Sequence, residues 1–158
     1  MVRLGAVVAG LVVVGLAVGG NPPPSDDLAA LQGNWKPLSI QFEGKDQIST
    51  ATELQKVTAV FDQKEYHLYY ADKAVSPPKV LKLAVANVAV DPNANPRAIE
   101  FTFAAGPLQG QKCHGIYELA GNQLKLCYGP ADKPRPATFG APVKSGYFLE
   151  VWAKQPTK

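Results

Sequence analysis

The stretch Gly115-Ile-Tyr-Glu-Leu-Ala-Gly-Asn-Gln-Leu-Lys-Leu-Cys127 places alternating apolar and polar side chains on both sides of a Gly-Asn pair. This pattern is typical of a β-hairpin, because successive strand residues face opposite sides and Gly or Asn tolerates the backbone of a tight turn. We take Gly121-Asn122 as a two-residue loop. The expected cross-strand pairs are then Ala120 with Gln123, Leu119 with Leu124, Glu118 with Lys125, Tyr117 with Leu126 and Ile116 with Cys127.

The same register bears on the two cysteines of the chain. Cys113 falls on the face of Tyr117, and Cys127 falls on the opposite face. A disulfide needs Cβ atoms about 4 Å apart, so this register predicts free thiols. A bulge or a three-residue loop would reverse the prediction, and the oxidising compartment of an exported protein leaves a disulfide open as the alternative.

Outward from this hairpin, the chain after Gly33 consists of short alternating or β-rich segments separated by Gly, Pro, Asn and Asp. Connections such as Asp62-Gln-Lys64 are too short for a crossover helix, so neighbouring strands should be antiparallel. Most segments have one apolar face, and closing such a sheet removes its edges. We therefore predict an all-β fold, an antiparallel up-and-down barrel of about eight strands. The expected strands cover 35–42, either 48–50 or 57–61, 65–71, 79–90, 98–104, 112–119, 123–128 and 147–153, with helical turns at 26–32 and 52–56.

The first twenty residues differ from the rest of the chain. Arg3 is their only charge, and residues 4–18 form an unbroken apolar run that is followed by Asn21-Pro-Pro-Pro-Ser25. A bilayer span needs about 20 apolar residues, whereas small residues such as Ala17 and Gly19 suit a signal peptidase. An uncleaved N-terminal anchor is the alternative. We predict a signal peptide over 1–20, a Pro-rich linker over 21–27 and the barrel domain over 28–154.

The charge pattern excludes one class of partner. The chain of 158 residues has a formal net charge of +3, and its Lys and Arg residues are scattered rather than clustered. We therefore expect no nucleic-acid partner. The signal peptide predicts a periplasmic or extracellular monomer with no membrane span after cleavage.

Several short motifs along the chain carry a resemblance: Leu31-Gln-Gly-Asn-Trp-Lys36, the Gly44-Lys45 turn, Arg97-Ala-Ile-Glu-Phe-Thr-Phe103, Gly115-Ile-Tyr-Glu-Leu119, Leu124-Lys-Leu-Cys127 and Lys133-Pro-Arg-Pro136. They resemble the pattern of an uncharacterised family of exported domains from planctomycetes and verrucomicrobia. That family is similar to the lipocalin-like β-barrels, in which a Gly-x-Trp motif lies on the first strand. The resemblance implies a lipocalin-like fold and export, and it implies that Lys154 packs over Trp35. It implies no activity.

No group of residues in the sequence points to catalysis or to a metal. A zinc site needs three or four ligands, whereas the chain has two isolated histidines, His67 and His114. No serine has the flanking glycines of a nucleophile elbow. We assign no catalytic residue, metal ligand or cofactor and expect a protein that is not an enzyme. A haem-binding barrel with one proximal histidine, as in nitrobindin-like proteins, is a weaker alternative. The acidic residues interpreted as solvated are Asp62, Glu65, Asp72, Glu100, Glu118 and Glu150.

The aromatic residues suggest one function. A small barrel either fills its interior with side chains or holds one small ligand, so these residues form either a core or the lining of a site for a small hydrophobic molecule. Under the second interpretation, tyrosine hydroxyls would orient the ligand. The candidate barrel-lining residues are Trp35, Tyr66, Tyr70, Phe101, Phe103, Tyr117 and Tyr147.

A second hypothesis concerns the Pro-rich loop over 129–142. Its prolines reduce the entropy lost on binding, so the domain could be a protein-interaction module, for instance an inhibitor of exported hydrolases. The same prolines also suit a rigid connection between two strands.

Overall fold

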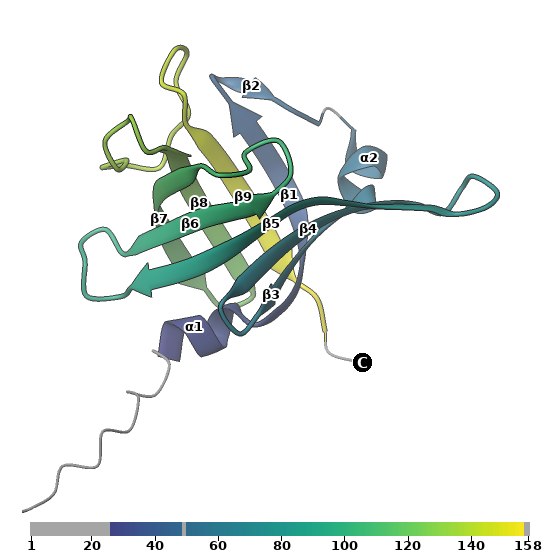
Figure 1. Ribbon diagram of the computed structural model, residues 1–158, viewed down its shortest axis with the longest axis horizontal. Coiled ribbons are helices and arrows are strands. Elements are labelled where there is room, and N and C mark those ends of the chain that lie inside the picture. Colours follow the sequence, from purple (N-terminus) through teal and green to yellow (C-terminus); the bar gives the residue numbers. More distant parts are fainter. Residues whose placement is uncertain (1–25, 49, 157–158) are drawn as a thin grey trace, which may run out of the picture.

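The computed structural model describes residues 26–48 and 50–156 (Figure 1). The predicted signal peptide over 1–20 and most of the predicted linker lie outside the described residues. The elements are α1 (Asp26–Leu31), β1 (Gly33–Phe42), β2 (Lys45–Asp46), α2 (Ala51–Lys56), β3 (Val57–Asp62), β4 (Glu65–Asp72), β5 (Lys79–Asp91), β6 (Ala98–Ala105), β7 (Lys112–Ala120), β8 (Gln123–Pro130) and β9 (Phe148–Lys154).

Eight of the strands close into a barrel. The hydrogen-bonded order is β1, β3, β4, β5, β6, β7, β8 and β9, every pairing is antiparallel, and β9 pairs back onto β1. The short strand β2 adds only to the end of β1. The predicted all-β, antiparallel up-and-down barrel is confirmed.

The β7–β8 hairpin has the predicted register at every position. Ala120 faces Gln123 across the turn, and Ile116 faces Cys127. Gly121 has a φ of 59°, which glycine adopts without a steric penalty. Both cysteines are buried free thiols, as the register predicts.

The connection between β1 and β3 decides between the two strands predicted as alternatives, 48–50 and 57–61. The strand at 57–61 is confirmed as β3, whereas Ile48 and Thr50, the described residues of the other segment, belong to no strand. Thr50 instead caps α2, since its side-chain oxygen accepts a hydrogen bond from the backbone N–H of Glu53 at 3.2 Å. A capping threonine satisfies a backbone donor that the first helical turn leaves free. The helical turn predicted at 52–56 is confirmed.

Helix α1 covers one end of the barrel (Figure 1). The Nε1 of Trp35 donates to the Leu31 carbonyl at 2.7 Å, and Nζ of Lys154 donates to the Ala30 carbonyl at 2.7 Å. The same ammonium lies 5.4 Å from the centre of a Trp35 ring, so the implied packing of Lys154 over Trp35 is present.

The predicted linker boundary at residue 27 is wrong. Asp27 belongs to α1, and its carboxylate accepts hydrogen bonds from the Tyr117 hydroxyl at 2.6 Å and from Arg97 at 3.1 Å. These contacts tie the helix to β7 and to the turn before β6. The folded domain therefore begins no later than Asp26.

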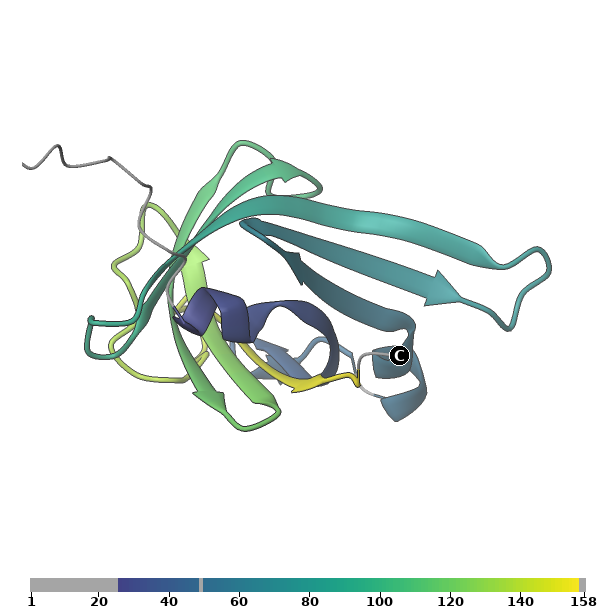
Figure 2. The ribbon, with the colours of Figure 1, turned by 90° about the horizontal axis from the view of Figure 1, so that it is seen from below.

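The hairpin of β4 and β5 projects beyond the barrel wall (Figure 2). β5 is the longest strand, and its first residues pair with β4 before its pairing with β6 begins at Val85. Among the described residues, no helix is long and apolar enough to cross a membrane.

Candidate functional site

The predicted lining residues lie mostly inside the barrel, where they form a core. Five of them are buried and belong to one hydrophobic cluster, and Tyr70 packs against that cluster while partly exposed. The five buried residues are Trp35, Tyr66, Phe101, Phe103 and Tyr117.

The rings contact one another rather than surrounding an empty centre. The ring centres of Tyr66 and Phe101 are 5.3 Å apart, and those of Phe101 and Tyr128 are also 5.3 Å apart. Tyr128 in turn stacks on Phe148 at 5.4 Å. Such separations are typical of packed aromatic pairs, so this part of the interior is filled by side chains.

Tyr147 is the exception, and its predicted position inside the barrel is wrong. It precedes β9, and its hydroxyl donates to the Pro134 carbonyl at 2.9 Å in the β8–β9 loop. Its ring also lies against the outer side of Gly129. Trp152 faces the interior. Successive residues of a strand face opposite sides, so the odd-numbered residues of β9 face outward, and the same alternation places Tyr147 outside.

A carboxyl group lies within this aromatic interior. Glu150 is only 5% exposed, so its interpretation as a solvated residue is wrong. The Tyr128 hydroxyl donates to Glu150 Oε1 at 2.8 Å, and Trp152 Nε1 donates to Oε2 at 2.9 Å. Removal from water raises the pKa of Glu150, and these two hydrogen bonds oppose that rise only in part. Burial and the nearby Glu150 raise the pKa of both Tyr66 and Tyr128.

A signal for Glu150 was present in the sequence. Phe148, Glu150 and Trp152 alternate along β9 and so face the same side. Glutamate is usually exposed to solvent, whereas the alternation of β9 indicates that residue 150 faces the interior. The period prevailed because Tyr128 and Trp152 supply the donors that a buried carboxylate requires.

The barrel end opposite α1 contains several partly exposed side chains. Its side chains are apolar, pack against the core and remain partly exposed, and we call this set the mouth: Ile40, Ile48, Leu68, Tyr70, Leu108 and Phe148. Ile40 faces Glu150 across the β1–β9 pair, so the carboxyl-bearing residue lies next to the mouth.

The Pro-rich loop packs on the outer face of β7 and β8. Cys127 Sγ donates to the Gly140 carbonyl at 3.2 Å, and the Lys125 ammonium lies 5.2 Å from the Phe139 ring centre. Ile116 and Cys127 face outward on their strands, yet both are fully buried. Two residues that the prediction gave to this loop, Gly129 and Pro130, belong to β8. These contacts favour a rigid covering connection over a free binding loop.

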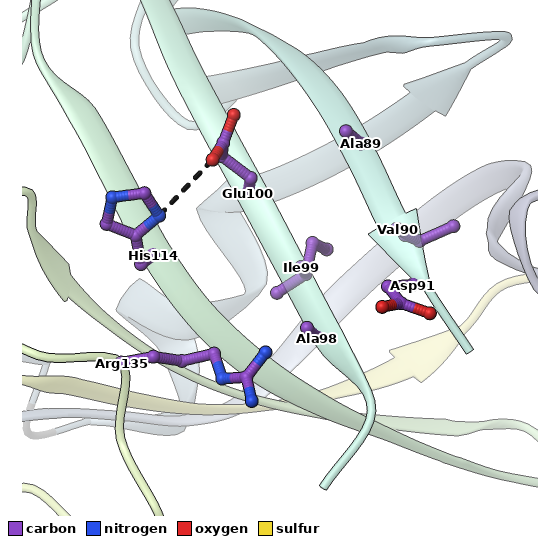
Figure 3. Close-up of a pocket in the computed structure, with 8 residues that line it drawn as sticks. All are labelled: Ala89, Val90, Asp91, Ala98, Ile99, Glu100, His114 and Arg135. Atoms are coloured by element: carbon purple, nitrogen blue, oxygen red, sulfur yellow. Dashed lines mark ion pairs between the residues drawn. The ribbon is translucent and has the colours of Figure 1, made fainter. Parts of the chain in front are cut away.

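A second concave site lies outside the barrel, over β5, β6 and β7 (Figure 3). It encloses about 280 Å³ and includes Arg135 from the Pro-rich loop. The Glu100 carboxylate lies 2.8 Å from Lys112 Nζ and 3.2 Å from His114 Nδ1. Its volume is slightly below the range of about 300–1,000 Å³ that is usual for ligand sites, and its carboxylate is already paired. The mouth is the other candidate site, because the buried carboxyl group of Glu150 lies beside its partly exposed apolar side chains.

Neither histidine faces the barrel interior. His67 and His114 lie on the outer faces of β4 and β7, where their rings contact Glu65 and Glu100. This contradicts the alternative of a haem held inside the barrel by a proximal histidine. In the part of the chain that the structure describes, no three His, Cys, Asp or Glu residues are grouped as a metal site requires.

No family model matches this chain, and neither the curated proteins nor the solved structures contain a significant match.

Proposed function

We propose that the protein is an exported, non-enzymatic barrel domain that binds one small, mainly apolar molecule at its mouth. The observation that carries this proposal is the buried carboxyl group of Glu150. A buried charge costs folding free energy, and an apolar side chain of similar volume would serve a purely structural interior at least as well. A buried group with a raised pKa beside partly exposed apolar side chains is a candidate for a binding site.

The geometry near Glu150 supports a particular kind of ligand. A carboxylate has about four acceptor positions, and Tyr128 and Trp152 each occupy one. The remaining positions suit a ligand that donates a hydrogen bond, such as a hydroxyl or an amine. The apolar part of that ligand would contact the mouth residues, whose exposed surface would then leave water.

Export rests on the sequence alone. A short apolar segment with small residues before a Pro-rich stretch is typical of a signal peptide. The proposed resemblance to exported lipocalin-like domains agrees with this location. Detection of a mature N-terminus near residue 21 in the periplasm or the medium would support export, whereas an intact N-terminus in the membrane fraction would support the anchor.

Two fluorescent probes that differ in one group test the binding proposal. These are 9-anthracenemethanol, which donates a hydrogen bond, and 9-anthracenecarboxylate, which is an anion. Near neutral pH we expect saturable binding of the alcohol at least about tenfold tighter than that of the anion, a difference of about 1.4 kcal/mol. The alcohol can donate a hydrogen bond to Glu150, whereas the carboxylate probe has no proton to donate.

Three variants locate the site. Glu150→Gln keeps the shape of the side chain and should remove most of the preference for the alcohol. Leu68→Glu at the mouth should weaken both probes, whereas Leu38→Glu, at a residue that is 48% exposed outside the barrel core, should change neither. No saturable binding, or equal binding of both probes before and after Glu150→Gln, would contradict the proposal.

A further inference from the structure

The β4–β5 hairpin carries an unpaired strand edge outside the barrel. We call residues 71–82 the arm, which Figure 2 shows extending away from the other strands. The pairing of β3 with β4 ends at Tyr70, and the pairing of β5 with β6 begins only at Val85. Gly106 packs against the Leu83 carbonyl and covers the edge there. Within the described residues, Lys79 to Lys82 therefore have a strand partner on one side only.

The arm is also the main exposed apolar surface of the described residues. Among the described residues, five large hydrophobic side chains are strongly exposed. Three of the five lie on the arm: Val75 at 46%, Val80 at 62% and Leu81 at 41%. An unpaired edge with exposed apolar residues is a template for another strand, and proteins usually shorten or cover such edges. Here the edge extends into solvent.

The charge of the arm defines the partner. Lys79 and Lys82 lie at the two ends of the free edge, and residues 73–90 contain no Asp or Glu. Asp72, the nearest acid in the sequence, faces Lys79 across the β4–β5 pair and is also 2.8 Å from Lys56, so two lysines share its single charge. An arriving strand would meet lysines at both ends of the edge and apolar side chains between them.

We propose that the arm docks an extended segment of a partner protein, with acidic residues flanking two apolar ones, as an added strand on Lys79–Lys82. Backbone hydrogen bonds to the free edge provide the contact, and the lysines select the partner's charge. This inference does not depend on ligand binding at the mouth.

Two other occupants fit the arm less well. A second copy pairing antiparallel over the whole free edge would place Lys79 opposite Lys82 of its partner, and like charges directly opposite are destabilising. A lipid surface would leave the backbone groups of the edge unsatisfied, which is costly in hydrocarbon.

A labelled peptide tests the proposal with the purified protein. The probe carries Thr-Glu-Ile-Val-Glu-Thr, and the control peptide has lysine in place of both glutamates. We expect saturable fluorescence anisotropy with the acidic probe, at least about tenfold tighter than with the basic control. N-methylation of the Ile and Val backbone nitrogens should abolish binding, because it removes the donors of the added strand.

Charge reversal on the protein provides the decisive comparison. The double variant Lys79→Glu, Lys82→Glu should bind the basic peptide more tightly than the acidic one. The matched variant Lys45→Glu, Lys144→Glu changes the net charge equally at exposed positions away from the arm and should keep the original preference. Binding of both peptides with equal affinity, or of neither at about 1 mM, overturns the proposal.

Two further measurements separate the other occupants. If sedimentation equilibrium detects a dimer, and Leu81→Asp abolishes it, the arm serves self-association. Co-sedimentation with phosphatidylglycerol vesicles that is lost in Val80→Asp would assign it to a membrane surface. Either result overturns the proposal, and a monomer that leaves the vesicles unbound supports it.

Discussion

The Tyr128→Phe substitution should destabilise the protein in a way that depends on the charge of Glu150. The variant removes one oxygen atom, the donor that lies 2.8 Å from Glu150 Oε1, and leaves a buried carboxyl group with Trp152 as its remaining donor. A hydrogen bond to a charged group contributes about 1.5–3 kcal/mol to stability, and a bond between neutral groups about 0.5–1.5 kcal/mol. The cost of the substitution should therefore change as Glu150 ionises.

The sign of the pH dependence follows from the raised pKa of Glu150. Folding favours the protonated carboxyl, so this contribution to stability is complete below the pKa of the unfolded chain and is lost as the pH rises through the folded pKa. Removing the Tyr128 donor raises the folded pKa further, because that hydrogen bond favours the charged form. We expect a cost of about 0.5–1.5 kcal/mol near pH 4 and a larger cost near pH 8, which reaches about 1.5–3 kcal/mol once Glu150 is ionised in the folded protein.

Urea unfolding at both pH values measures these costs. Tyr147→Phe is the matched control, because it also deletes a tyrosine hydroxyl, here one that donates a hydrogen bond within the β8–β9 loop. It should lower the free energy of unfolding by less than about 0.5 kcal/mol at either pH. In the Glu150→Gln background, the pH dependence of Tyr128→Phe should disappear. A cost near zero at pH 8, or an equal cost at both pH values, would refute the proposed role of Glu150.

Three further outcomes can be checked separately. Gly115→Ala should cost about 1–3 kcal/mol in urea unfolding, because a Cβ there would lie 2.7 Å from the Cys127 carbonyl oxygen, whereas Gly140→Ala should have little effect because its nearest neighbour would be 3.9 Å away. Asp27→Ala should cost about 1–3 kcal/mol, since it leaves the Tyr117 hydroxyl without its acceptor, and an unchanged midpoint would contradict this. Without reductant, alkylation should label neither cysteine in the folded protein and both after unfolding, because both thiols are buried with raised pKa values; no label after unfolding would indicate a disulfide.

The strand register was predictable because its causes are local. The alternation around Gly121 fixes which side chains share a face, and the short loop fixes which residues are opposite. The same local pattern predicted the other strands and the eight-stranded closure. Burial of one face along every segment leaves few alternative folds for residues 26–48 and 50–156, in which both helices are short.

The polar interior was harder to predict because its causes are distant in sequence. Glu150 is stabilised by Tyr128, which lies 22 residues earlier, and a single carboxylate gives no local sign of such a partner. The position of Tyr147 was mispredicted for a simpler reason. An odd number of positions separates Tyr147 from Trp152, so the strand period places the two side chains on opposite faces. The linker boundary at residue 27 was also hard to predict, because Asp27 contacts Arg97, a residue 70 positions away.

The two ends of the barrel differ in how far their side chains are buried, and both proposals concern the same end. At the α1 end, Leu31 and Trp35 are fully buried and joined by a hydrogen bond, so this end is sealed by the backbone of a helix. The opposite end contains the mouth and the base of the arm. Tyr70 belongs to both, since it is a mouth residue and also faces Leu81 of the arm. A ligand that exchanges with solvent therefore has its shortest path beside the surface proposed for the partner, and both proposals can be tested on this one end of the molecule.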